Sequence, residues 1–270
     1  MNSGRFGNGD TMFLTAGKGI SHAEVFPLIH KDKPNTLKLF QIWLNLPRKT
    51  KLAPPHFEMH WAENVNNITE NATGGAYCRV YVGSLGNVEN NCPIPPASWA
   101  KDPVNDVGVY VITLPPGGSK FVLPACNYGK DIHRYAYLTE GKGLKISGTK
   151  VGPKQYVALD GSMDVEFVNL HPEETGEVLI LQGRPIKEPI AQRGPFVMNS
   201  NEEIAEAFSD YRRGEFGEWT WPSDAMDFPR DSGRFASYSL GNGKFRVDRP
   251  PVTDETSETS SSSNSNTKEL

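Results

Sequence analysis

Short runs of apolar residues, each bounded by Gly, Pro or Asn, recur along most of the chain. Runs of four to eight residues with such boundaries are typical of β-strands separated by turns. Around Val109, apolar residues alternate with their neighbours, as a sheet with one buried face requires. The pattern predicts an all-β sandwich or barrel, with strands over residues 11–14, 37–44, 77–82, 107–114, 135–138, 144–147, 155–159, 164–169 and 178–182.

One segment near the end departs from this strand periodicity. Ser200 and Glu203 form a capping box, and apolar residues follow at helical spacing from Ile204 to Tyr211, before Gly214. The spacing predicts a helix of about three turns. Its apolar stripe is expected to pack against the β body rather than to serve a docking function.

Composition supports this picture and removes several classes of function. A chain of 270 residues with 26 Gly and 21 Pro has many turns, which disfavours a helix bundle. The formal net charge of -4 provides no basic field for direct nucleic-acid binding. Neither a signal peptide nor an apolar run long enough to cross a membrane is recognisable. The three cysteines, Cys78, Cys92 and Cys126, lack metal-ligand spacing and favour a reducing compartment.

The last residues differ from the rest of the chain. Residues 251–270 are rich in Ser, Thr and Glu and almost free of apolar side chains. Because nothing repays the entropy of ordering such a segment, we expect a disordered tail.

Candidate chemistry rests on six histidines. His22 and Glu24 form an H-x-E pair, and on a strand both side chains would point to one face and could converge on a metal. The preceding glycines in TAGKGISHAE would let the chain bring this pair into a barrel interior. The weaker candidates are His56 and His60, which an extended chain places about 13 Å apart, His30 in a surface turn, and His133 with Glu140, which resemble a worn metal motif.

Three runs carry a resemblance to a known family: GDTMFLTAGKGISHAE, LKLFQIWLNLP and RGPFVMNSNEEIAEAFSDYRRGEFG. From about Asn8 to Gly217 the chain closely resembles pirins, which are iron-binding proteins of the cupin superfamily. The resemblance implies an all-β bicupin, in which two β-barrels face each other and a C-terminal helix packs on the body. It also implies an iron held by three histidines and one glutamate, of which His22 and Glu24 match the last histidine and the glutamate.

The chain departs from the family at the other two iron ligands. In pirins they form an H-x-H pair upstream of the matched region, and no H-x-H occurs in these 270 residues. Residues 1–72 are therefore expected to be a remnant of the N-terminal barrel, followed by the C-terminal barrel (73–195), the helix with its extension (196–250) and the tail (251–270). Non-haem iron is expected only if the missing ligands are present upstream.

The resemblance leaves three interpretations of function open. The first is a quercetin 2,3-dioxygenase-type oxidoreductase acting on a small aromatic flavonol, with weak or no activity for the chain as it stands. The second is a non-enzymatic cofactor of a transcription factor, and the third is an inactive fragment or incomplete gene model. A cytoplasmic or nuclear monomer, without direct nucleic-acid or membrane binding, fits all three.

Overall fold

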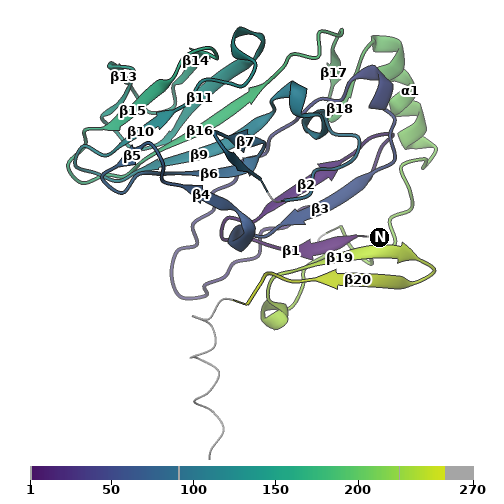
Figure 1. Cartoon of the computed structure of the whole chain (residues 1–270). Coiled ribbons are helices and arrows are strands. Elements are labelled where there is room, and N and C mark those ends of the chain that lie inside the picture. The colour runs from purple at the N-terminus through teal and green to yellow at the C-terminus, as the bar shows by residue number, and fades with distance from the viewer. Residues whose placement is uncertain (1, 91, 225, 253–270) are drawn as a thin grey trace, which may run out of the picture.

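The larger part of the molecule is a pair of facing antiparallel sheets (Figure 1). The computed structural model describes residues 2–90, 92–224 and 226–252. One sheet has six strands in the order β14 (Tyr156–Asp160), β11 (His133–Glu140), β16 (Gly176–Gly183), β9 (Gly108–Leu114), β6 (Tyr77–Val82) and β4 (Asn66–Ile68). The other has five, in the order β13 (Thr149–Val151), β12 (Leu144–Ile146), β15 (Val165–Asn169), β10 (Lys120–Leu123) and β5 (Ala72–Thr73). We call this pair of sheets the sandwich.

The core of the sandwich lies between the two sheets. Tyr110, Phe121, Phe167 and Ile180 are almost completely buried there and belong to one apolar cluster. In β6, buried and half-buried residues alternate along the whole strand, as the period of a strand requires. The strands predicted from residue 77 to residue 182 are confirmed, because each has its apolar face in this core.

The helix and two hairpins flank the sandwich. Helix α1 (Asn201–Arg212) begins at a capping box, in which the Glu203 N–H donates to Ser200 Oγ at 3.3 Å. Ile204 is buried, and the ring of Phe208 packs edge-on against Phe196 at 4.7 Å between centroids. The predicted helix is therefore confirmed, and it packs on the hairpin of β17 (Ala191–Arg193) and β18 (Phe196–Met198). The second hairpin joins β7 (Ser84–Leu85) to β8 (Val88–Glu89).

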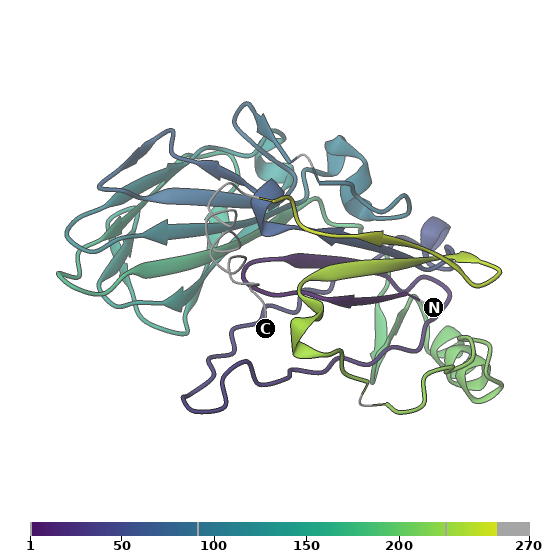
Figure 2. The same ribbon diagram turned by 90° about the horizontal axis from the view of Figure 1, so that it is seen from below.

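The two ends of the chain form a second, smaller body, which we call the terminal layers. Strand β2 (Thr11–Thr15) pairs with β3 (His56–His60), and β1 (Ser3–Arg5) pairs with β19 (Phe235–Gly241), which pairs with β20 (Lys244–Asp248). Figure 2 shows the C-terminal hairpin lying alongside the N-terminal strands. Between the two layers Phe57, Met59, Trp61 and Ala236 are buried together.

The strand predicted over residues 37–44 is wrong. The whole segment 20–47 lacks regular structure, and no strand among the described residues pairs with it. Alternating apolar residues form a strand only where a partner strand is available, and here their side chains face solvent. We call residues 25–43 the apolar strap; nine large apolar side chains in it are 39 to 66% exposed: Val25, Phe26, Leu28, Ile29, Leu37, Leu39, Phe40, Ile42 and Trp43.

Short 3-10 turns complete the connections, at Arg48–Thr50, Ala62–Asn64, Trp99–Lys101, Pro103–Asn105, Gly129–Asp131 and Arg230–Ser232. Over the described residues, no helix has the length and apolar character needed to cross a membrane. The tail predicted to be disordered falls almost entirely outside the described residues, which end at 252.

Candidate metal centre

The predicted metal ligands follow a tight glycine turn at the end of β2. Gly17 has a φ of +54°, and a Cβ added there would lie 1.9 Å from the carbonyl oxygen of Ala53. That carbonyl accepts a hydrogen bond from the Lys18 N–H at 3.0 Å. Gly19 has a φ of +124°, and its Cβ would lie 2.4 Å from the ring of Phe216. Both glycines thus allow close packing on other segments. We expected them to bring the following residues into a barrel interior, and the structure does not show this.

His22 and Glu24 lie just beyond this turn, in the irregular segment. Both residues are exposed, and the chain between them forms no strand, so the same-face argument for a strand does not apply. Within the described structure neither side chain has a hydrogen-bond or ion-pair partner. Their nitrogen and oxygen lone pairs are therefore available, but no neighbouring protein group orients them.

The other histidine pair lies on β3, which is extended as expected. His56 Nε2 lies 2.8 Å from Glu58 Oε1, so the imidazole is occupied by a carboxylate two residues away on the same strand face. His60 is 1% exposed, and its Nε2 lies 2.7 Å from the carbonyl oxygen of Pro93. The two imidazoles are thus engaged separately, and the structure does not bring them together.

The position of His60 determines its protonation. Because a carbonyl only accepts, Nε2 must carry the proton, which leaves the buried Nδ1 as a lone pair without a partner. Burial lowers the pKa of His60, and it outweighs the hydrogen bond to Pro93 and the charge of Glu58, which raise that pKa. His60 is therefore a neutral histidine of the terminal layers.

The remaining candidates are also separated. His133 and Glu140 stand at opposite ends of the eight-residue strand β11, and Glu140 is ion-paired with Lys38 at 2.8 Å. His30 lies in a turn closed by Asn35, whose side chain accepts a hydrogen bond from the His30 N–H at 2.8 Å. His171 Nδ1 accepts the N–H of Glu174 at 2.8 Å and so has a structural role in a turn.

These contacts permit a test of the iron site that the pirin resemblance implies. Across the part of the chain that the structure describes, no three or more His, Cys, Asp or Glu side chains gather where they could hold one metal ion. A catalytic metal normally takes at least three protein ligands. The described residues therefore supply at most the His22–Glu24 pair, and they do not fit a complete iron site.

A buried polar cluster inside one end of the sandwich was not anticipated from the sequence. Arg134 is 2% exposed, and its Nε donates to Gln182 Oε1 at 2.9 Å. The amide of Gln182 in turn donates to Asp106 Oδ1 at 3.1 Å. The Cys126 thiol lies 3.6 Å from the same Gln182 oxygen, and burial raises its pKa to about 11. Cys126 is thus a buried, protonated thiol in a hydrogen-bonded network, and its burial disfavours the thiolate that a nucleophile requires.

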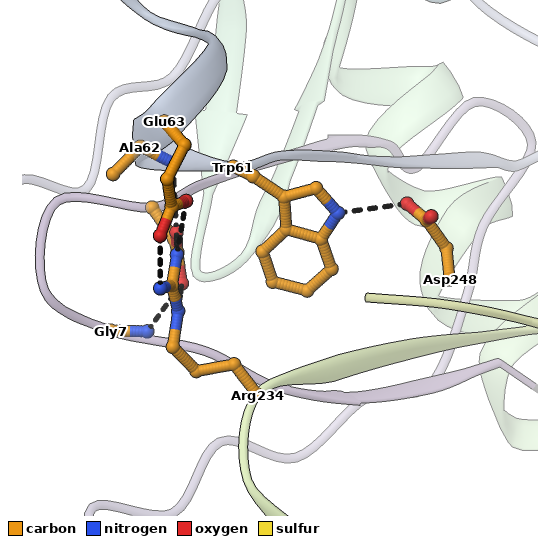
Figure 3. A network of polar contacts seen from close by, with 7 residues as sticks. Gly7, Trp61, Ala62, Glu63, Arg234 and Asp248 are labelled. Atoms are coloured by element: carbon orange, nitrogen blue, oxygen red, sulfur yellow. Dashed lines mark hydrogen bonds and ion pairs between the residues drawn. The ribbon is translucent and has the colours of Figure 1, made fainter. Parts of the chain in front are cut away.

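A second polar network joins the two ends of the chain (Figure 3). The Arg234 guanidinium donates to both oxygens of Asp10, and to Glu63 at 2.7 and 2.9 Å. The same group lies 5.5 Å from the ring centroid of Trp61, whose Nε1–H donates to Asp248 at 2.8 Å. Residues separated by 171 to 224 positions therefore hold the terminal layers together.

Comparison with known proteins shows which family this chain resembles. Residues 110–217 match the model of the pirin C-terminal cupin domain. A Pseudomonas aeruginosa protein, provisionally named a quercetin 2,3-dioxygenase, is 32% identical over 213 residues, which cover 79% of this chain and 70% of that protein. A pirin-like protein of Caulobacter vibrioides is 30% identical over 218 residues, 80% of this chain and 71% of its relative. Human pirin is 28% identical over 225 residues, which cover 82% and 71% of the two chains.

A solved structure agrees with these relatives. The crystal structure of quercetin 2,3-dioxygenase from Acinetobacter baumannii superimposes with a TM-score of 0.52 at 27% identity. The match covers 64% of this chain and 55% of that one, so the chain spans about half the length of this structure. The sandwich, with its flanking helix, is thus an all-β cupin fold, as predicted. Within the cupins, the chain belongs to the pirin family.

Proposed function

We propose that this protein is a metal-binding pirin of the quercetin 2,3-dioxygenase type, and that His22 and Glu24 are its iron ligands within these 270 residues. The observation that carries the proposal is that the side chains of His22 and Glu24 are accessible and available to bind a metal. Both side chains are exposed and free of other partners within the described structure. The names of the Pseudomonas and Acinetobacter relatives supply the substrate class, a flavonol.

The same observation limits the activity of this chain by itself. Iron held by His22 and Glu24 would supply Lewis-acid and redox chemistry. Two protein donors leave most of the coordination shell to water and do not orient it. We therefore expect weak iron binding and weak or absent turnover of quercetin by the 270-residue chain.

Iron titration of the purified chain tests this proposal. Under anaerobic conditions, Fe²⁺ is added and the bound metal is measured after desalting, and quercetin consumption is then followed in air. We expect less than one iron per chain, and further loss in His22→Ala. His30→Ala is the matched control, because it removes an imidazole from the same irregular segment without touching the pair.

Two results would contradict the proposal. Unchanged metal content in His22→Ala would remove the role assigned to His22. Stoichiometric, tightly held iron in the wild-type chain would contradict a site with only two protein ligands.

A further inference from the structure

A row of lysines crosses the outer face of the five-stranded sheet. Lys150 of β13 lies opposite Lys145 of β12. Lys145 and Lys120, which is on β10, both lie opposite Val168 of β15. Directly opposite residues point to the same face, and their neighbours along the strands belong to the core cluster, so these side chains form one outward line. We call Lys120, Lys145 and Lys150 the lysine row.

Two of the three charges in the lysine row are not compensated. Lys145 and Lys150 are a directly opposed pair of like charges, which destabilises a sheet. Within the described residues neither amine has an ion pair or a hydrogen bond, whereas Lys120 lies 3.6 Å from Glu166. Segment 141–159 contains no acidic residue that could relieve the repulsion. An anionic group placed between the two amines would relieve it.

The N-terminal segment contacts the other sheet of the sandwich. Lys38 is ion-paired with Glu140 on β11 and with Glu177 on β16, both in the six-stranded sheet. The strands of the five-stranded sheet all lie between residues 72 and 169. Figure 1 shows the labelled strands β10, β13 and β15 at the end of the sandwich away from β1, β19 and β20. The lysine row therefore faces away from the N-terminal segment.

We propose that the lysine row binds an acidic segment of a partner protein, whose carboxylates lie along the row. Charge complementarity carries this choice. Neighbouring strands are about 4.8 Å apart, so the row is about 14 Å long, and a single chain can follow it. One carboxylate between Lys145 and Lys150 removes their repulsion. The row shares no residue with the His22–Glu24 pair, so the proposal does not depend on metal binding.

Two other anionic partners fit this face less well. Glu166 is two residues from Val168 on the same face of β15. A flat anionic bilayer would bring its head groups against Glu166 as well as the lysines, whereas a narrow segment can lie along the row alone. Nucleic acid is disfavoured by the formal net charge of -4, which repels a long polyanion.

Fluorescence anisotropy of a labelled decaglutamate peptide, titrated with the whole chain at low and at physiological salt, tests the proposal. We expect saturable binding that weakens as salt rises. Lys145→Ala combined with Lys150→Ala should raise the dissociation constant about tenfold, because it removes two of the three cations. Lys101→Ala combined with Lys244→Ala is the matched control, since it removes the same charge from exposed positions outside the row.

Lys150→Glu separates binding from stability. It replaces the like-charge pair with an opposite-charge pair across β12 and β13. The free chain should therefore melt at a higher temperature, although its affinity for decaglutamate falls. A variant that is more stable but binds less shows that the opposed lysines serve a ligand and not the fold.

Each alternative outcome overturns the proposal. Equal losses in the two double variants would show that the peptide senses overall charge alone. A lower melting temperature in Lys150→Glu would mean that the opposed lysines stabilise the sheet. A chain that binds phosphatidylserine vesicles but not decaglutamate has a bilayer as its partner. Tighter peptide binding in a chain with Asp254→Asn, Glu255→Gln and Glu258→Gln would show that the protein's own C-terminal residues occupy the row.

Discussion

The sandwich and the terminal layers are built from the same kind of antiparallel strand, but they are closed by different parts of the chain. In the sandwich, all strands, from β4 to β16, lie between residues 66 and 183, within a single stretch of chain. In the terminal layers, Ser3 pairs with Ser237, at the other end of the protein. Pairing between residues far apart in sequence has a larger entropic cost of loop closure, which its contacts must offset before the pairing stabilises the fold. The terminal layers therefore depend more heavily on a few strong contacts.

The size of each core reflects this difference. The sandwich buries a large continuous apolar cluster between its two sheets, whereas the apolar cluster of the terminal layers has four buried residues: Phe57, Met59, Trp61 and Ala236. A small core has fewer packing contacts to stabilise it, so the terminal layers can unfold locally while the sandwich stays folded. Variants in the two regions should separate these behaviours.

The largest difference is expected from matched core deletions. Phe121 is 0% exposed in the sandwich and Phe57 is 8% exposed in the terminal layers. Phe121→Ala should lower the free energy of unfolding by about 3–5 kcal/mol, and Phe57→Ala by about 2–3 kcal/mol, because the smaller site collapses more easily. Urea unfolding measures both values.

Hydrogen exchange of the same two variants shows which regions open. Phe57→Ala should speed exchange in β1, β2, β3 and β19, and leave β9 and β16 protected. Phe121→Ala should speed exchange everywhere. Equal acceleration of both regions in Phe57→Ala would mean that the sandwich and the terminal layers unfold as one unit, and would contradict separate opening of the smaller core.

A smaller effect is expected from the network that joins the chain ends. Arg234→Met leaves the Asp10 carboxylate, whose side chain is 0% exposed, without its cation, and should cost about 2–4 kcal/mol. Arg213→Met is the control, since its partners Asp210 and Glu215 lie at the surface and the pair should be worth less than about 1 kcal/mol. Similar losses of thermal stability in the two variants would show that the network contributes no more than a surface ion pair.

These contrasts also show what the sequence could predict. The strands of the sandwich and helix α1 follow from local periodicity and from the capping box at Ser200, because their partners are near in sequence. The strap has the same strand periodicity, but periodicity does not reveal whether a partner strand exists. Strands β19 and β20 flank a Gly241-Asn242-Gly243 turn that signals a hairpin, yet nothing local indicates that the hairpin pairs with β1.

In the candidate site too, local features could be predicted from the sequence and tertiary contacts could not. His22 and Glu24 were found through the motif around them, and the structure adds that they are exposed and unoriented. The glycines of that motif were misinterpreted, because the close approach of Ala53 to Gly17 is a tertiary contact. The Arg134–Gln182–Asp106 network had no sequence signal, since its members come from three separated segments.

The smallest effect is a pH dependence confined to the terminal layers. Burial lowers the pKa of His60 below its ordinary value of 6.5, so the folded protein holds it neutral where the unfolded chain would protonate it. The stability that depends on neutral His60 is complete above pH 6.5 and is lost as the pH falls toward the folded pKa. The loss should reach up to about 1.4 kcal/mol at pH 5.5 if His60 stays neutral there.

The comparison of His60→Gln with wild type at pH 7.5, 6.5 and 5.5 isolates this contribution. Gln retains an N–H donor for the Pro93 carbonyl but does not titrate, so the variant should lose less stability than wild type between pH 7.5 and 5.5. His133→Gln, an exposed position on the sandwich, should keep the wild-type slope. If His60→Gln also keeps that slope, the unpartnered Nδ1 is protonated in the folded state, and the terminal layers accommodate a buried cation that the present contacts do not satisfy.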